Sequence, residues 1–176
     1  LRLHTRLVGE CNVSNLLAAV AMAVAMGVPD DRIVYAVSQI EHVEHRLAVK
    51  HISSDLTIID DAFNSNPAGA AMALDVLAAM KLGGRVLVTP GMIELGDRQY
   101  ELNADFGEKA AVSADTVIVV GQYNRDAIVE GLKRGGMADE HIVIADSFAD
   151  AQAQLNSHAF PVKIILYEND LPDTFK

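Results

Sequence analysis

Cysteine and tryptophan are nearly absent from this sequence. Cys11 is the single cysteine among 176 residues, there is no tryptophan, and 51% of the residues are hydrophobic. One cysteine cannot form an internal disulfide, so nothing links the chain to an oxidising compartment, and we expect a cytoplasmic protein. The length suits one domain, or one domain with a fragment of a second, around a core of aliphatic side chains.

Positive charge and long apolar runs are also scarce. The formal net charge is −10 and no cluster of lysine or arginine occurs, which argues against a nucleic-acid partner because phosphate binding needs a basic face. The longest apolar run, from Leu16 to Met26, is too short to span a bilayer. It predicts a buried helix without membrane insertion, and we expect no signal peptide before it.

The first 45 residues predict the end of a strand followed by two helices. Residues 1–9 look extended, and because the chain opens in mid-pattern without an initiator methionine, we expect a fragment of a longer protein. Gly27 is expected to end the first helix, and Asp30 or Asp31 to cap the second.

From Arg46 onward, short β-branched runs alternate with helical segments. Continuous apolar strands separated by helices predict an α/β fold, with a Rossmann-like, mostly parallel sheet and helices on both faces. Residues 47–53 are expected to pair antiparallel at an edge. Ligands of such sheets bind outside the carboxyl ends of the strands. The loops expected there are DDAFNSNP, TPGMIELGD, GQYNRD, ADSFAD and YENDLPD.

The usual phosphate-binding loops are missing, since neither G-x-x-x-x-G-K-[ST] nor G-x-G-x-x-G after a strand occurs. The segment DDAFNSNP is the most suggestive alternative. Asn66 and Pro67 form a good helix start, and whether Asn66 does more than cap the helix stays open. Asp60 and Asp61 favour a functional role, because adjacent carboxylates repel unless a cation, a donor or a ligand hydroxyl compensates.

Other polar segments carry weaker signals. Asn12 and Asn15 lie three residues apart and could cap a helix or meet a planar ligand such as a nucleobase. Glu94 is isolated in a glycine-rich loop that by itself is only a turn, and the acids of YENDLPD predict a solvated turn. The histidines match no metal-ligand spacing, and we expect no metal site from His42, His45 and His51. No G-x-S-x-G elbow is present.

Four segments in order resemble the Mur ligase family, the ATP-dependent amide ligases of peptidoglycan precursor synthesis. They are GECNVSNLLAAVAMA, EHRL, IIDDAFNSNPAGAAMAL and VLVTPGMIELG. The resemblance covers essentially the whole chain. It implies that residues 1–45 are the helical C-terminal end of a central ATPase domain and that residues 46–176 are the C-terminal domain.

The resemblance also implies roles for individual residues. Nucleotide contacts fall on Asn12, Asn15, Arg46, Asp60 and Asp61. Asp61, or its neighbour Asp60, would bind the ribose hydroxyls, and both aspartates would face the interdomain cleft. The lining of the nucleotide and substrate cleft falls on Phe63, Asn64 and Asn66, and Glu94 would help to shape the pocket for the amine. In place of the family's usual histidine, tyrosine and second histidine this chain has Cys11, Phe63 and Asn103. The ring survives at Phe63, whereas a phenolic hydrogen bond does not.

The implied reaction joins a UDP-N-acetylmuramoyl peptide to D-alanyl-D-alanine or another amine, through an acyl phosphate. ATP and Mg²⁺ would be required, in a monomer, with Mg²⁺ bound mainly by a central domain that also carries the phosphate loop. No catalytic residue and no metal ligand is assigned to this chain, and the fragment alone is expected to be inactive. Three alternatives stay open: the ligase subunit that amidates lipid-linked precursors with a glutaminase partner, a polyglutamate ligase, and a non-catalytic ligand-binding module.

Overall fold

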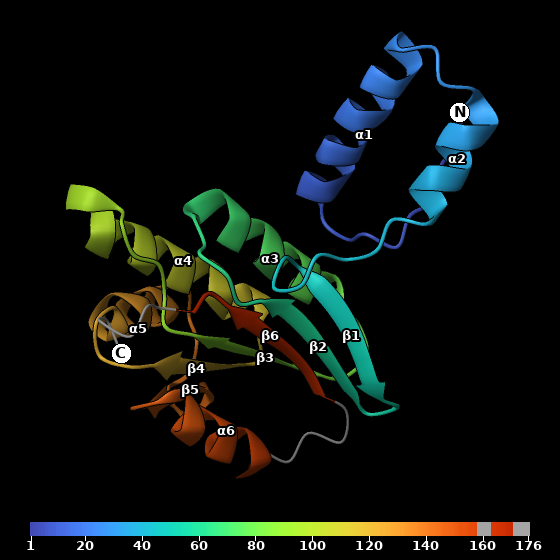
Figure 1. Ribbon diagram of the computed structural model, residues 1–176. Helices are drawn as coiled ribbons and strands as arrows, with labels where there is room; N and C mark the ends of the chain where they lie inside the picture. The colour runs from blue at the N-terminus through green and yellow to red at the C-terminus, as the bar shows by residue number, and fades with distance from the viewer. Residues whose placement is uncertain (158–162, 171–176) are drawn as a thin grey trace.

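A six-stranded sheet organises the molecule, seen in a computed structural model that describes residues 1–157 and 163–170 (Figure 1). The strand order is β1-β2-β6-β3-β4-β5, with β1 antiparallel to β2 and the other neighbours parallel. The predicted mostly parallel sheet and its antiparallel edge are therefore confirmed. The strands are β1 (Ala48–Ser53), β2 (Leu56–Asp61), β3 (Gly84–Thr89), β4 (Thr116–Val120), β5 (Ile142–Ala145) and β6 (Lys163–Glu168).

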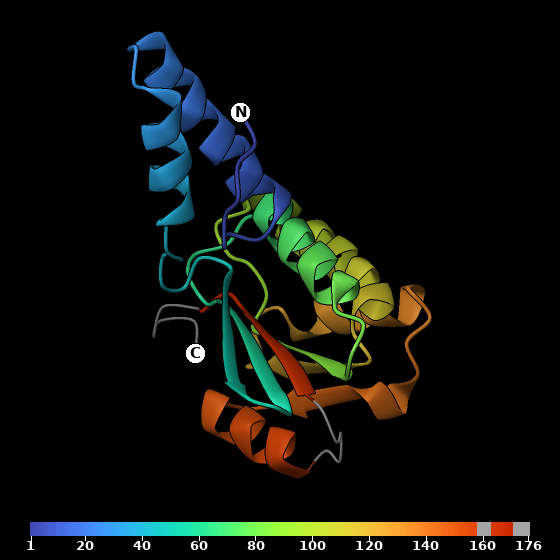
Figure 2. The same cartoon turned by 90° about the vertical axis from the view of Figure 1, so that its right-hand side faces the viewer.

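Helices cover the two faces of the sheet unequally. On one face α3, α4 and α5 share a core with the strands, and on the other α6 packs on a smaller core built from β3, β4, β5 and β6 (Figure 2). Because one helix cannot cover a six-stranded sheet, the α6 face stays open beside β1 and β2. These helices are α3 (Pro67–Ala79), α4 (Gln99–Ser113), α5 (Arg125–Arg134) and α6 (Phe148–Ser157), with 3-10 turns η1 (Gly96–Arg98) and η2 (Asp139–His141).

Helices α4 and α5 approach closely because glycines line their contact. A Cβ atom added to Gly131 of α5 would lie 1.9 Å from the carbonyl oxygen of Ala104 in α4. One added to Gly107 of α4 would lie 2.4 Å from the carbonyl oxygen of Ile128 in α5. The two backbones therefore touch without intervening side chains, which fixes how α4 and α5 lie on the sheet.

The first two helices, α1 (Glu10–Ala25) and α2 (Asp30–Ser38), form a hairpin that stands apart from the sheet (Figures 1 and 2). They share a small core of Leu16, Ile33 and Val37. The prediction of a buried helix is wrong, since Leu16 is the one buried residue of α1. The reason is that α1 packs along one side on α2 and meets α3 only at its beginning. No helix among the described residues is long and apolar enough to cross a membrane.

Two further expectations for this region are also wrong. Residues 1–9 form no strand, because no other described segment pairs with them, and Leu3 instead packs on the hairpin core. Neither Asp30 nor Asp31 caps α2, since the helix begins at Asp30 itself with Pro29 at the N-cap. The predicted helix end at Gly27 is confirmed by its φ of 75°.

The junction between the hairpin and the sheet has an unusual backbone. His45 and Leu47 have φ values of 57° and 51°, a region that residues with a side chain seldom occupy. Arg46 lies between them. Leu47 is buried in the main core, and its N–H donates to Asp61 Oδ1 at 2.8 Å. These contacts hold a strained turn at the point where the predicted domain boundary falls.

Candidate functional site: two cavities at the end of β2

The carboxyl ends of β2, β6 and β3 lie side by side, as predicted for the ligand-binding edge of the sheet. Asp60 and Asp61 are the last residues of β2. Successive side chains of a strand point to opposite faces, so the two carboxylates separate. Asp61 lines a cavity on the α3 side, and Asp60 lines another on the α6 side. The expectation that both aspartates face one cleft is therefore wrong.

The cavity on the α3 side, here called the hinge cavity, has a volume of about 660 Å³. It lies between the beginning of α1, the junction before β1 and the loop from β2 to α3. Most of the residues predicted for the nucleotide and substrate cleft line it together: Asn12, Asn15, Arg46, Asp61, Phe63, Asn64 and Asn66. Residues up to 54 positions apart in the sequence thus meet at one site, a grouping that residue spacing alone does not dictate.

Arg46 and Phe63 form the most distinctive contact of the hinge cavity. The guanidinium carbon of Arg46 lies 4.1 Å from the centroid of the Phe63 ring, a cation-π geometry. The ring is half exposed. Since Arg46 also exerts an attractive field on the carboxylate of Asp61, cation, ring and carboxylate lie within one small region.

The asparagines of the cavity have different local roles. Asn66 caps α3, because its Oδ1 accepts the Gly69 N–H at 3.0 Å and Pro67 follows as the first helical residue. The predicted cap is confirmed. Asn12 is tied to the start of α1 by a 2.7 Å hydrogen bond from its Nδ2 to the Val8 carbonyl oxygen. Asn15 and Asn64 are exposed, with their side chains available at the cavity wall.

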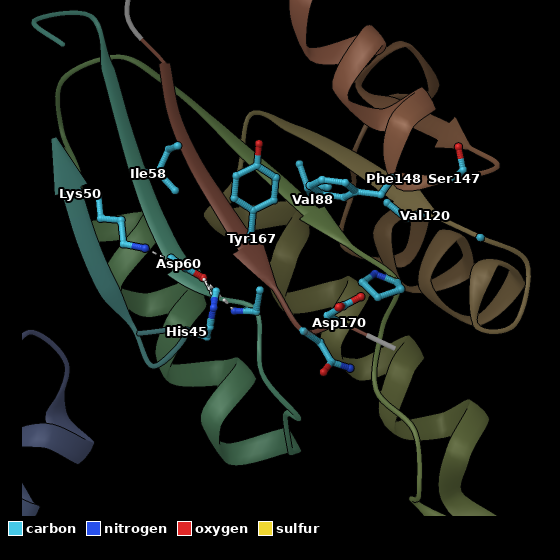
Figure 3. Close-up of a pocket in the computed structure, with 14 residues that line it drawn as sticks. His45, Lys50, Ile58, Asp60, Val88, Val120, Ser147, Phe148, Tyr167 and Asp170 are labelled. Atoms are coloured by element: carbon cyan, nitrogen blue, oxygen red, sulfur yellow. Dashed lines mark hydrogen bonds and ion pairs between the residues drawn. The ribbon is translucent and has the colours of Figure 1, made fainter. Parts of the chain in front are cut away.

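Asp60 is held by two basic side chains on the opposite face of the sheet (Figure 3). Lys50 Nζ lies 2.7 Å from Asp60 Oδ2, and His45 Nδ1 lies 3.0 Å from Oδ1. Burial opposes ionisation of Asp60, but the hydrogen bonds from Lys50 and His45 outweigh it, so the pKa of Asp60 is lowered. The same contact with Asp60 raises the pKa of Lys50. The charge of Asp60 is thus compensated within the protein.

The cavity beside Asp60, here called the sheet-face cavity, has a volume of about 700 Å³ and mostly apolar walls. Its centre is Tyr167 of β6, whose ring centroid lies 5.7 Å from that of Phe148 at the start of α6 (Figure 3). Side chains of β2, β3 and β4 add to the wall, among them Ile58, Val88 and Val120. This cavity fills the part of the sheet face that α6 leaves uncovered.

Glu94 lines neither cavity. It is exposed, with a φ of 64°, in the loop that follows β3. Asn103, at the family's second histidine position, holds this loop instead. Asn103 is fully buried, its Oδ1 accepts the Met92 N–H at 2.8 Å, and its Nδ2 donates to the carbonyl oxygens of Met92 and Gln99. Asn124 also donates to Met92, so side-chain amides define the shape of the loop.

Glu168 and Ser65 are the site residues that sequence reasoning missed. The expected solvated turn at YENDLPD is wrong for its first acid, because Glu168 is fully buried at the end of β6. The Ser65 hydroxyl donates to Glu168 Oε1, which ties the β2–α3 loop to β6. Asn169 is buried as well, whereas residues 171–173 of the segment lie outside the described residues. The signal available in the sequence was the position of Glu168 directly after the apolar run IILY.

Burial also shifts the pKa values of two neighbouring carboxyl groups at the hinge cavity, those of Asp61 and Glu168. Burial and then the negative charge of Asp61 raise the pKa of Glu168 to about 8. The pKa of Asp61 is raised too, chiefly by burial, although the Leu47 N–H and Arg46 favour its ionised form. The pair therefore retains a proton over a wider pH range than two exposed carboxyls would.

Among the described residues, the histidines do not gather into a metal centre. His45 contacts Asp60, and His51 Nδ1 lies 3.0 Å from Thr57 Oγ1 across the β1–β2 hairpin. Within residues 1–157 and 163–170 there is no group of three or more histidine, cysteine or acidic side chains placed to hold a metal ion. We therefore assign no metal ligand to these residues.

Comparison with known proteins identifies the family to which this chain is similar. The family described as "Mur ligase, glutamate ligase domain" matches residues 45–167. The chain is 34% identical over 117 residues to UDP-N-acetylmuramoyl-tripeptide--D-alanyl-D-alanine ligase of Escherichia coli. That match covers 66% of this chain and 26% of the enzyme, so the chain spans about a quarter of the length of this relative.

Solved structures agree with the sequence comparison. MurF from Acinetobacter baumannii has a TM-score of 0.79 at 28% identity, with 96% of this chain and 36% of that chain covered. MurF from Thermotoga maritima, solved in complex with ADP, shares the fold with a TM-score of 0.77 at 19% identity, covering 93% of this chain and 35% of that chain. Because the family match covers most of the chain, this chain belongs to the Mur ligase family.

Proposed function

We propose that this chain is the ATP- and amine-contacting C-terminal part of an ATP-dependent acid-amine ligase. The full-length protein would add D-alanyl-D-alanine to a UDP-N-acetylmuramoyl tripeptide in peptidoglycan precursor synthesis, in the cytoplasm and as a monomer. The observation that carries the proposal is the hinge cavity, where Arg46, Asp61 and Phe63 meet asparagines from the start of α1.

The residues of the hinge cavity suit the adenosine half of a nucleotide. An ionised Asp61 can accept hydrogen bonds from the paired hydroxyls of a ribose, and the amides of Asn12 and Asn15 can meet the edge of a base. Arg46 can approach a phosphate while its guanidinium rests on Phe63. A volume of about 660 Å³ lies within the range of small-molecule sites.

The sheet-face cavity and the loop after β3 are less specific in their chemistry. The role of Glu94 in shaping the amine pocket stays a prediction, because its side chain lies in neither cavity of this chain. Asp60 is neutralised by Lys50 and His45, so we propose that it supports the junction before β1 and does not contact the ribose.

The remaining chemistry is assigned to the rest of the full-length protein. We propose that α1 and α2 are the end of a central ATPase domain, whose other parts would cover the exposed apolar side chains of α1. That domain would supply the phosphate loop and the ligands of Mg²⁺, for which the described residues offer no site. ATP would phosphorylate the substrate carboxylate, the amine would attack the acyl phosphate, and closure of the two domains would exclude water.

The proposal is tested by ligation assays on the full-length protein carrying Arg46→Ala or Asp61→Ala. Loss of a hydrogen bond to a charged group costs about 1.5–3 kcal/mol, so we expect KM for ATP to rise about 10- to 100-fold in both variants. Arg46→Ala should leave thermal stability nearly unchanged, whereas Asp61→Ala should lower it slightly, because it also removes the acceptor of the Leu47 N–H. Asp55→Asn is the matched control, because Asp55 is an exposed carboxylate on the same hairpin. Unchanged ATP kinetics in both variants, with intact folding, would show that these residues do not bind the nucleotide.

The identity of the amine is tested separately. The matching family also includes glutamate ligases, so a related ligase with another amine is the second candidate. We expect turnover with the tripeptide substrate and D-alanyl-D-alanine, and little with D-glutamate or L-alanine in its place. Preference for a different amine would leave the proposed ATP site unchanged but would show that D-alanyl-D-alanine is not the amine substrate. Measurable turnover by residues 1–176 alone would contradict the assignment of the phosphate loop to the rest of the protein.

A further inference from the structure

Glu168 and Asp61 occupy matching positions on neighbouring strands. Asp61 ends β2, Glu168 ends β6, and the two residues are partners in the register of this parallel pair. Register partners point to the same face of a sheet, so the carboxyls lie side by side and within hydrogen-bonding reach of each other. Glu168 has no exposed surface, while Asp61 is half buried and opens into the hinge cavity.

The hydrogen-bond partners of Glu168 are incomplete unless a proton is present. Its Oε1 accepts the Ser65 hydroxyl, but its Oε2 is buried and receives a hydrogen bond from no donor among the described residues. An ionised carboxylate without a donor is costly in a dry environment, and a second carboxylate beside it adds repulsion. One proton between Glu168 Oε2 and Asp61 removes both costs.

The surrounding charges place the negative charge of the pair on Asp61. Arg46 and the Leu47 N–H both favour ionised Asp61, whereas the opposing charge of Asp60 is itself held by Lys50 and His45. On the other side of Glu168, the end of β3 presents no titratable side chain. Glu168 is therefore the partner that keeps the proton.

We propose that Glu168 is a positioning residue that, in its protonated form, donates a hydrogen bond to Asp61 and aims the Asp61 carboxylate into the hinge cavity. The inference rests on the proposed nucleotide site, because it explains how that site is kept in shape. Ser65 completes the arrangement, because its hydrogen bond ties the β2–α3 loop, which also carries Phe63 and Asn64, to the Glu168 carboxyl group.

A pH consequence follows from this arrangement. Burial and the charge of Asp61 raise the pKa of Glu168 to about 8, so the hydrogen bond is present at neutral pH and is lost when the pH rises through that value. Above it the pair carries two negative charges, and repulsion moves Asp61 away from the position that a ribose would require. Nucleotide affinity is expected to fall in that range.

The test compares Glu168→Gln with Glu168→Ala in the full-length protein, with KM for ATP and Kd for ADP measured across neutral and alkaline pH. Glutamine keeps the donor and cannot ionise, so its affinity at neutral pH should stay within about twofold of wild type, without the alkaline loss. Alanine should weaken affinity about three- to tenfold relative to wild type at neutral pH, because one hydrogen bond is worth about 1 kcal/mol, and it should show no further alkaline loss. Glu140→Gln, at an exposed glutamate, should reproduce the wild-type pH profile.

Two results would overturn the inference. The first is an alkaline loss of affinity in Glu168→Gln equal to that of wild type, and the second is wild-type affinity in Glu168→Ala. A readout independent of nucleotide is the carboxyl titration of Glu168, followed by ¹³C NMR in protein without ligand. Asp61→Asn should lower that pKa by removing the neighbouring charge. Asp61→Asn could lower the pKa of Glu168 as expected and still leave ATP kinetics unchanged. That result would contradict the proposed nucleotide site but support the proton shared by Glu168 and Asp61.

Discussion

Arg46 rests on the ring of Phe63, with its guanidinium carbon 4.1 Å from the ring centroid. The contact joins the junction before β1 to the loop after β2, the two segments that contribute most to the hinge cavity. It also retains the ring at a position where the family usually has tyrosine, so the stacking surface is kept without the phenolic hydroxyl.

Replacement of Phe63 should therefore affect the nucleotide more than the fold. An exposed cation-π pair contributes about 0.5–1 kcal/mol, so Phe63→Ala in the full-length protein should raise KM for ATP about two- to fivefold. Phe63→Tyr should retain wild-type KM, and Leu82→Ala, at an exposed position away from both cavities, is the control for loss of an apolar side chain. A fall in thermal stability with unchanged KM would instead indicate a structural role for the ring.

Asn103 is expected to be essential for stability. Asn103→Leu fills a similar volume but leaves the Met92 N–H without its buried acceptor, which should lower the free energy of unfolding by about 2–4 kcal/mol. Urea unfolding measures this change. Asn156→Leu, on the exposed side of α6, should change it little, and equal effects of the two substitutions would contradict the role of the amide.

The contact between α4 and α5 predicts a strong effect of one methyl group. Gly131→Ala places a Cβ atom where the Ala104 carbonyl oxygen lies, so the helices must separate at a cost of about 3 kcal/mol. Gly69→Ala in α3 is the matched control, since its Cβ atom would meet its neighbours at 3.7 Å or more. Thermal unfolding should show a large loss for Gly131→Ala and a neutral or slightly stabilising effect for Gly69→Ala.

Glu168 also predicts how stability depends on pH. Its pKa rises from 4.5 in the unfolded chain to about 8 in the folded one, so between these values the folded state holds a proton that the unfolded state has released. Stability from this group is complete below 4.5 and declines as the pH rises towards 8. Glu168→Gln removes this contribution, so the stability of the variant relative to wild type should improve as the pH rises through that window. Urea unfolding at both ends of the window measures the trend, and a constant difference would contradict it.

Much of the fold follows from local sequence, because continuous apolar strands, a proline after Asn66 and a glycine at position 27 act through nearby residues. The separation of Asp60 from Asp61 was also within reach, since adjacent strand residues always alternate. The burial of Glu168 could not be predicted in this way, because it depends on β6 lying between β2 and β3. No local pattern indicates this long-range pairing. The exposure of α1 likewise depends on what packs against it, which its own apolar composition does not reveal.

The central place of β6 has a consequence for how the molecule assembles. β2 and β3 are close in the sequence but each pairs with β6, and neither pairs with the other. Until residues 163–168 arrive, the sheet has a gap beside the strand that carries Asp61, and two strand edges stay open to wrong partners. Asp61 and Glu168 therefore come together only when β6 joins the sheet, and a chain truncated before residue 163 would form two separate half-sheets.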